Sequence, residues 1–173
     1  MKLEARCENI QLILSDVDGV LTDGGIIFDN QGIETKKFFV RDGLGIILWK
    51  RAGHDFGILT ARTSHIVNVR ADELGIDLVR QGFQEKLQVA QEIMDQRNLK
   101  PAQVCYIGDD LADLPVIRHV GLGVAVADAA ADVASAADYV THAGGGRGAV
   151  RELIEIILKA QQRWGDLIQK YTE

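Results

Sequence analysis

Apolar runs of strand length alternate with helical patterns along most of the chain. Six runs, most of them continuously apolar, are typical of strands covered on both faces of a sheet; they are Ile10–Leu14, Phe56–Thr60, Leu78–Val79, Val104–Ile107, Leu122–Val126 and Tyr139–Val140. Helical spacing is found in five segments, Leu44–Arg51, His65–Leu74, Glu85–Arg97, Leu111–Val120 and Gly148–Tyr171. Strand alternating with helix predicts an α/β fold, a doubly wound parallel sheet with flanking helices.

One segment interrupts this alternation. Residues Gly24–Val40, "GGIIFDNQGIETKKFFV", are typical of a β-hairpin whose turn is Asp29-Asn30-Gln31-Gly32. The segment comes directly after the first strand and the acidic loop that follows it. We therefore expect a hairpin flap that overhangs the carboxyl end of that strand; the alternative is a plain surface ribbon.

The last predicted helix carries an apolar stripe at helical spacing. Most of the stripe is expected in the core, and its late part, around Trp164, is a candidate for packing on another subunit. The chain shows no internal repeat, low-complexity segment or linker. We expect a single domain over residues 1–173, with the flap at about 24–40 and a C-terminal tail at about 144–173.

Composition narrows the class of protein. The chain has 173 residues, 47% of them hydrophobic, which suits one domain with a sizeable core. A net charge of −6 disfavours a nucleic-acid or anionic-membrane surface, although a small anionic substrate remains compatible. No apolar run reaches the roughly 20 residues of a membrane span, and "MKLEARCENIQ" lacks the apolar stretch of a secretory signal. Cys7 and Cys105 form no CxxC and are interpreted as reduced thiols of a cytoplasmic protein, and the four histidines lack zinc-ligand spacing.

Carboxylates follow the first predicted strand abruptly. In "LILSDVDGVLTDGG" an apolar run ends in Asp16, Asp18 and Asp23. Like charges repel, and each carboxylate loses hydration when it is partly buried. This cluster therefore requires a cation, or a phosphoryl group with a metal, beside it.

Other polar residues end the neighbouring strands. The second strand ends in Thr60, Lys86 begins the helix before the fourth strand, and that strand ends in Asp109 and Asp110, with Asp113 three residues on. Sites of open parallel sheets form outside the carboxyl ends of the strands, so these side chains are expected to converge. The alternative for Asp110 or Asp113 is a helix cap.

The expected set has a coherent chemistry. Asp16 and Asp109 offer the hard oxygen ligands that suit Mg²⁺. Asp16 could attack phosphorus as a nucleophile, and Asp18 could protonate the leaving alkoxide and later deprotonate the attacking water. Thr60 and Lys86 could hold phosphoryl oxygens, over which charge is spread in the transition state.

These residues carry a family resemblance. "DVDGVLTD", "LTAR", Lys86 and "GDDLAD" resemble, in order and spacing, the four motifs of the haloacid dehalogenase-like phosphohydrolase superfamily. The resemblance implies a Rossmann-like core, Mg²⁺, a nucleophile at Asp16 and an acid/base at Asp18. It also implies metal contacts from Asp16, the Asp18 backbone carbonyl and Asp109, with Asp110 and Asp113 beside the ligands or as occasional ligands.

Members of this superfamily commonly carry a cap domain, and this chain has no room for one on either side of Thr60. A capless enzyme must close its site in another way, and a neighbouring subunit is the obvious means. "VRDGLGI", "ARTSHIVNVRADELGI", "QGFQEK" and "GGGRGAVREL" resemble the capless phosphatases of 3-deoxy-D-manno-octulosonate 8-phosphate, a sugar acid of lipopolysaccharide synthesis. That resemblance covers nearly the whole chain and implies a homotetramer in which flap and tail elements of adjacent subunits complete each site.

The same resemblance gives roles to basic residues. Arg62 and Arg70 would meet the carboxylate or hydroxyls of the sugar acid, since the planar guanidinium donates two parallel hydrogen bonds, and Lys86 would bind the phosphate. Arg147 lies in the glycine loop 144–148 and could reach over the site. A solvated helix face and a mobile loop without function are the alternatives. Asp42 begins a helix and is interpreted either as its N-cap or as a substrate residue.

Three alternatives remain open from the sequence, and the first is a phosphatase of nine-carbon sugar-acid 9-phosphates. The usual "TGR" of the family is "TAR" here, and Ala61 could alter the fit of the substrate. Related capless enzymes that act on nine-carbon sugar-acid 9-phosphates tend to carry Glu and Lys near the Arg62 and Arg70 positions, so arginine at both favours the eight-carbon substrate. A non-catalytic assembly module, like the domain attached to some sugar-acid cytidylyltransferases, is a second alternative. A signalling receiver domain is the third, and its motif order does not match.

Overall fold

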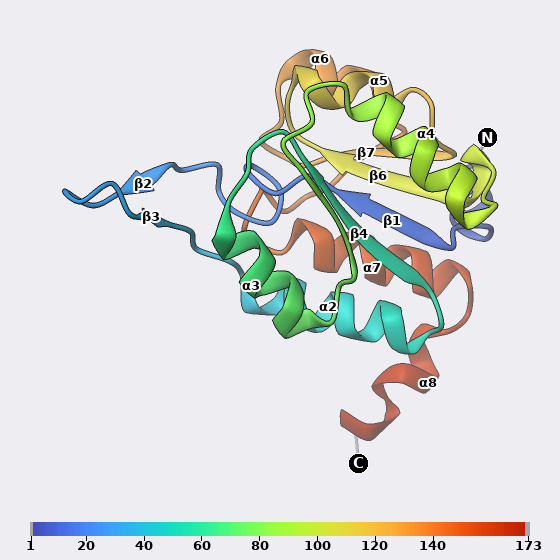
Figure 1. Ribbon diagram of the computed structural model, residues 1–173. Coiled ribbons are helices and arrows are strands. Elements are labelled where there is room, and N and C mark those ends of the chain that lie inside the picture. Colours follow the sequence, from blue (N-terminus) through green and yellow to red (C-terminus); the bar gives the residue numbers. More distant parts are fainter. Residues whose placement is uncertain (1, 172–173) are drawn as a thin grey trace.

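A computed structural model describes residues 2–171 and arranges them as a central sheet with helices on both faces (Figure 1). The strands are β1 (Leu12–Ser15), β2 (Ile27–Phe28), β3 (Glu34–Thr35), β4 (Asp55–Thr60), β5 (Leu78–Gln81), β6 (Val104–Gly108), β7 (Leu122–Ala125) and β8 (Tyr139–Val140). The α-helices are α1 (Leu3–Cys7), α2 (Val40–Arg51), α3 (His65–Leu74), α4 (Lys86–Arg97), α5 (Leu114–Ile117), α6 (Ala131–Ala136), α7 (Ala149–Ala160) and α8 (Trp164–Ile168), and short 3-10 helices are η1 (Pro101–Gln103), η2 (Leu111–Asp113) and η3 (Gln169–Tyr171). No helix among residues 2–171 is both long and apolar enough to cross a membrane.

The main sheet has the strand order β5-β4-β1-β6-β7-β8, and every neighbouring pair is parallel. β1 is central, with Leu12 opposite Asp55 of β4 on one side and Val104 of β6 on the other. All four residues of β1 are buried, as a strand covered on both faces requires. The predicted doubly wound α/β fold is confirmed, and all six predicted strands are present. Their carboxyl ends share one edge.

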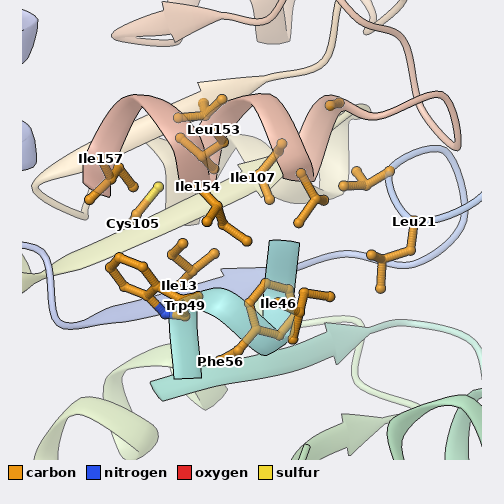
Figure 2. Packing of buried hydrophobic residues seen from close by; sticks show 14 of the residues in the cluster. Ile13, Leu21, Ile46, Trp49, Phe56, Cys105, Ile107, Leu153, Ile154 and Ile157 are labelled. Atoms are coloured by element: carbon orange, nitrogen blue, oxygen red, sulfur yellow. The ribbon is translucent and has the colours of Figure 1, made fainter. Parts of the chain in front are cut away.

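The hydrophobic core has a layer on each face of the sheet. In one layer Ile13 of β1, Trp49 of α2 and Ile154 of α7 are fully buried and belong to one cluster (Figure 2). In the other, Tyr106 of β6 and Ile93 of α4 belong to a second cluster. The two layers fix the central strands, and hence the positions at which the loops leave them.

The predicted final helix, Gly148–Tyr171, is not continuous, and contacts of the residues after α7 explain this correction. α7 ends at Ala160, and Gln162 adopts the left-handed conformation with φ 57°. The Gln161 side chain donates to the backbone carbonyls of Cys7 and Ile10, at 3.0 and 2.9 Å, which ties the end of α7 to the N-terminal segment. The chain then restarts as α8, where Trp164 packs against the core of its own chain. The α7 part of the expected tail thus contributes its buried face to the core.

Two further boundaries differ from the sequence expectation. α2 begins at Val40 rather than Leu44, so Asp42 lies inside the first turn and is not its N-cap. The predicted helix Leu111–Val120 is a 3-10 turn followed by the short α5, because Pro115 can start a helix but cannot continue one. The short helices α1 and α6 are absent from the sequence prediction.

The predicted hairpin is present. β2 pairs antiparallel with β3, and Asp29 Oδ1 accepts the N–H groups of Gln31 and Ile33, each at 2.8 Å. Figure 1 shows the hairpin projecting from the body of the molecule instead of folding over the sheet. Large apolar side chains near its tip are 45–57% exposed; they are Ile26, Ile27, Phe28 and Ile33.

Candidate active site

The carboxyl edge of the sheet gathers the residues expected there. Asp16 follows β1, Thr60 ends β4, Asp109 follows β6, and Lys86 begins α4. Carboxylate oxygens of Asp16, Asp109 and Asp113 lie within 4.8 Å of one another. The parallel topology brings together side chains up to 97 residues apart, as the sequence predicted.

Lys86 is the buried cation of this cluster. Its Nζ lies 2.6 Å from Asp16 Oδ2 and 2.7 Å from Asp113 Oδ1, and its side chain is 1% exposed. The other oxygen of Asp16, Oδ1, accepts the N–H of Val17 at 2.7 Å. One ammonium group thus pairs with two carboxylates of a group of three, which Asp109 completes, and the cluster keeps a net negative charge.

Asp113 is more central than the sequence indicated. It is fully buried, its Oδ1 accepts the Tyr106 hydroxyl at 2.6 Å, and its Oδ2 accepts the Asp109 N–H at 2.9 Å. Asp113 thereby holds the loop that carries Asp109. Asp110 is exposed and accepts the N–H of Leu111 at 2.8 Å, which is the capping role weighed as its alternative. Sequence reasoning missed Tyr106, because an aromatic residue inside an apolar strand gives only a core signal.

Gly19 lets the two acidic loops meet. Its φ is 92°, and a Cβ atom built there would lie 2.0 Å from Asp109 Oδ2. Any side chain would collide with that carboxylate and would strain the backbone as well. The glycine in "DVDG" is therefore required by the approach of Asp109 to the loop after β1.

The acidic cluster shifts the pKa values of its members. Burial, followed by the charges of Asp113 and Asp16, raises the pKa of Asp109 to about 7. Burial raises the pKa of Asp16 to about 6, against the opposing effect of Lys86. Both carboxylates are costly to ionise without further positive charge.

A divalent cation fits this site. Asp16 and Asp109 supply carboxylate oxygens close together, with Asp113 as a third, and hard oxygen ligands suit Mg²⁺. The negative charge that Lys86 leaves unbalanced is the physical reason for metal affinity. The predicted ligand pair Asp16 and Asp109 is thus brought together. Of the two aspartates predicted beside the ligands, Asp113 lies against the pair and Asp110 is turned toward the N–H of Leu111.

The raised pKa values predict how metal stabilisation depends on pH. A folded carboxylate with a raised pKa holds its proton where the unfolded one has lost it, so its contribution to apoprotein stability is present at low pH and is lost as pH rises from about 4 to about 7. Mg²⁺ needs the ionised forms and competes with those protons. We expect the rise in Tm on adding MgCl₂ to be large at pH 8 and small at pH 5.5, measured by thermal unfolding.

The Asp109→Asn variant is the control for this prediction. It removes one ligand charge, and the Tm shift caused by MgCl₂ is expected to shrink at pH 8. An equal shift at pH 5.5 and pH 8 in the unmodified protein would contradict the assignment of the metal to these carboxylates.

Asp18 lies beside the base of the flap. The Lys36 ammonium bonds Asp18 Oδ1, and Arg62 Nε lies 3.4 Å from Asp18 Oδ2. Arg62 Nη2 and the Ser64 hydroxyl both donate to Glu34, at 2.8 and 2.6 Å. These bonds, that of Ser64 foremost, lower the pKa of Glu34 to about 2 despite partial desolvation. The flap thus contacts the site through its base, while its tip projects away.

Sequence reasoning missed Glu34 and Lys36. A signal was available, because residues two apart in a strand point to the same face, and "ETK" places an acid and a base in that relation. Nothing in the sequence showed that this face of the hairpin would meet Asp18, because the bend at the base of the flap sets its direction.

The other two predicted arginines lie apart from the carboxylates. Arg70 Nη1 pairs with Glu73 at 2.7 Å, and its guanidinium stacks 5.8 Å from the centre of the Phe38 ring. Arg147 lines a surface groove of about 630 Å³ beside Arg41. The structure brings only Arg62 of the three into contact with the predicted catalytic residues, so the substrate roles of Arg70 and Arg147 remain predictions.

The glycine loop 144–148 does reach the site. The Gly146 N–H donates to the Val20 carbonyl at 2.8 Å, directly beyond the "DVDG" segment. A Cβ on Gly145 would lie 1.9 Å from the Gly19 carbonyl oxygen. The loop therefore lies backbone against backbone on the segment that follows Asp18.

Comparison with known proteins agrees with this geometry. Residues 56–153 match the model of the haloacid dehalogenase-like hydrolase family. The 3-deoxy-D-manno-octulosonate 8-phosphate phosphatase of Yersinia pestis is 48% identical over 158 residues, which cover 91% of this chain and 84% of that protein. This match favours the hydrolase interpretation over a receiver domain.

Solved structures of phosphatases also resemble this chain. The 3-deoxy-D-manno-octulosonate 8-phosphate phosphatase of Moraxella catarrhalis, determined with magnesium, phosphate and KDO, superposes with a TM-score of 0.96 at 40% identity and covers 97% of each chain. The cobalt-bound phosphatase of Haemophilus influenzae gives a TM-score of 0.91 at 40% identity, over 97% of this chain and 99% of that one. The resemblance inferred from the motifs is confirmed, and the chain belongs to the haloacid dehalogenase-like hydrolase family.

Proposed function

We propose that this protein is a Mg²⁺-dependent phosphatase that hydrolyses 3-deoxy-D-manno-octulosonate 8-phosphate to KDO and phosphate. The observation that carries the proposal is the site itself, where Asp16 bonds Lys86 within a cluster of three carboxylates and Asp18 lies two residues on. The identity of 48% to a phosphatase of this substrate over most of the chain supports the sugar acid named.

The residues divide the reaction between them. A carboxylate oxygen of Asp16 attacks phosphorus, and the sugar oxygen leaves with a proton from Asp18. Water, deprotonated by Asp18, then attacks the phosphorus of the aspartyl-phosphate, which releases phosphate and restores the Asp16 carboxylate. Lys86 and Thr60 hold the phosphoryl oxygens during both steps.

Mg²⁺ would be held by Asp16, Asp109 and the backbone carbonyl of Asp18. When bound, it supplies the positive charge that brings an anionic phosphate close to these carboxylates. Asp113 bonds both Lys86 and the N–H of Asp109, so it positions a catalytic side chain and a ligand together.

Arg62 is the substrate residue that this chain places best. It lies beside Asp18, its side chain is 45% exposed, and it already holds a carboxylate, that of Glu34. The planar guanidinium suits the carboxylate of a sugar acid, which would compete with Glu34 for it. Arg70 and Arg147 are proposed to contribute from the rim of the site.

The proposed assembly is a homotetramer that acts in the cytoplasm. Exposed Ile27 and Phe28 at the flap tip form an apolar surface of the kind that monomers rarely leave uncovered. A hairpin that projects from its own subunit can close the site of a neighbour, as a capless enzyme requires. Both cysteines are buried and unpaired, in keeping with a reducing compartment.

A substrate panel tests this function. With Mg²⁺ we expect kcat/KM for 3-deoxy-D-manno-octulosonate 8-phosphate to exceed that for hexose phosphates, which lack a carboxylate, by at least about 100-fold, since a guanidinium–carboxylate pair contributes roughly 3 kcal/mol. Nine-carbon sugar-acid 9-phosphates carry the same carboxylate, so a smaller preference over them is expected, which would come from the pair Arg62 and Arg70. The measurement is steady-state phosphate release. In the Arg62→Ala variant the preference over hexose phosphates is expected to fall about tenfold or more.

Other outcomes identify the alternatives. A preference for a nine-carbon compound would retain the Asp16 chemistry and assign specificity to Ala61 and the glycine loop. No phosphate release from any compound, with EDTA making no difference, would favour the non-catalytic assembly module. An unchanged preference in Arg62→Ala would remove that residue from carboxylate recognition.

A further inference from the structure

Asp42 is a buried carboxylate that the proposed mechanism does not use. It lies in the first turn of α2 and is 2% exposed. Its Oδ1 accepts the backbone N–H of Arg151, 109 residues away, at 2.8 Å. Arg151 is in the first turn of α7, so the carboxylate of one helix meets the N-terminus of another.

The start of α7 has no cap of its own. Its N-cap residue is Gly148, which offers no side chain. The N–H groups of a first helical turn have no partner within the helix and carry partial positive charge, so they favour a carboxylate. Asp42 supplies it from outside the helix.

The ionised state of Asp42 depends on this helix end. Burial raises its pKa to about 6, and the N–H groups of Arg151, Gly148 and Val150 oppose that shift. Oδ2 is buried and makes no hydrogen bond of standard geometry within residues 2–171. Above pH 6 the negative charge of Asp42 is therefore stabilised mainly by the first turn of α7. This interaction holds the start of α2 against that turn.

This contact fixes the loop that comes before α7. Gly146 of that loop donates to Val20, and Gly145 lies against Gly19, immediately after the proposed acid/base Asp18. A Cβ on Gly148 would also lie 3.4 Å from the ring of Phe39, where the flap ends. A shift of the α7 N-terminus would thus move the glycine loop away from the catalytic segment.

We infer that Asp42 is a positioning residue, which holds the glycine loop 144–148, and Arg147 with it, against the segment after Asp18. A residue with a merely structural role in the core would stabilise the whole domain. A positioning residue affects one loop and the substrate that this loop meets.

Hydrogen exchange of the full-length protein separates these two roles. Asp42→Ala removes the acceptor, whereas Asp42→Asn keeps an oxygen that can cap a helix. In Asp42→Ala the Gly146 amide is expected to exchange about fivefold faster, the change that loss of a helix cap implies, while Tyr106 in β6 exchanges as before. Asp42→Asn is expected to restore slow exchange, and Asp132→Ala, at an exposed aspartate in the first turn of α6, is the matched control.

The catalytic readout rests on the proposed function, whereas exchange does not. Asp42→Ala is expected to raise KM for 3-deoxy-D-manno-octulosonate 8-phosphate about fivefold and to leave kcat for p-nitrophenyl phosphate unchanged. When Arg147→Ala is already present, the addition of Asp42→Ala is expected to raise KM no further. Faster exchange at Gly146 with an unchanged KM would support the positioning role and remove Arg147 from substrate binding.

Two exchange results would overturn the inference. One is an unchanged Gly146 amide in Asp42→Ala. The other is faster exchange throughout β6 as well, which indicates loss of global stability. Asp42→Leu, whose side chain has nearly the size and shape of aspartate but no acceptor, is the second variant, and it is expected to give the same local increase if Asp42→Ala does not fold.

Discussion

Replacement of Asp16 by asparagine is expected to abolish phosphate release, by roughly 1,000-fold or more in kcat, while the fold is retained. The amide oxygen can still accept the Val17 N–H, and Lys86 keeps its bond to Asp113. The amide nitrogen then faces Lys86 Nζ, so the ammonium is expected to shift toward Asp113 while the surrounding fold stays in place. The amide is a poor nucleophile, so no aspartyl-phosphate forms. Steady-state phosphate release and thermal unfolding measure the two effects separately.

Asp110→Asn is the matched control. It also removes one negative charge from the acidic loops, but at an exposed cap that asparagine can maintain. Its kcat is expected to stay within a few fold of the unmodified protein. Near-normal turnover by Asp16→Asn would exclude the covalent mechanism.

The Lys86→Met variant is expected to be both inactive and strongly destabilised. The substitution leaves Asp16 and Asp113 buried without the cation that pairs with both, and removal of one partner from a buried ion pair costs about 3–5 kcal/mol. The loss appears in the free energy of unfolding, measured with urea in EDTA. Added Mg²⁺ is expected to recover part of the stability and none of the activity, because it binds the carboxylates but cannot take the place of Lys86 beside the phosphoryl oxygens.

Lys37→Met provides the comparison. Lys37 also pairs with an aspartate, Asp23, at 2.9 Å, but its side chain is 71% exposed, so its loss is expected to cost less than about 1 kcal/mol. The double variant Lys86→Met/Asp113→Asn is expected to regain part of the lost stability, because it removes one of the unpaired charges. A Lys86→Met protein as stable as the original would mean that the ion pairs contribute nothing.

The catalytic centre could be predicted because it depends on topology. Asp16, Thr60 and Asp109 each end a strand, and strands of a parallel sheet place their carboxyl ends at one edge whatever their distance along the chain. Strand existence can be recognised from continuous apolar runs, so the positions follow from the sequence. Lys86 could be placed because its helix starts at the same edge.

The residues that the sequence did not reveal depend on directions that no local pattern encodes. Lys36 reaches Asp18 because of the bend at the base of the flap, and Asp42 caps a helix 109 residues away. The end of α7 was missed because Gln162 takes a left-handed conformation that glycine or asparagine normally signals. In both cases a side chain bonds a backbone group far away in the sequence: Asp42 bonds the N–H of Arg151, and Gln161 at the end of α7 bonds the carbonyls of Cys7 and Ile10.

The contact between the glycine loop and the catalytic segment has a consequence for synthesis of the protein. Val20 leaves the ribosome early and Gly146 late, yet the two are hydrogen-bonded neighbours. β1 likewise needs β6 beside it before Asp16 can meet Asp109. A nascent chain therefore carries the nucleophile long before it has the surroundings that activate it, and a growing polypeptide is expected to remain inert toward phosphate esters until most of its length has been made.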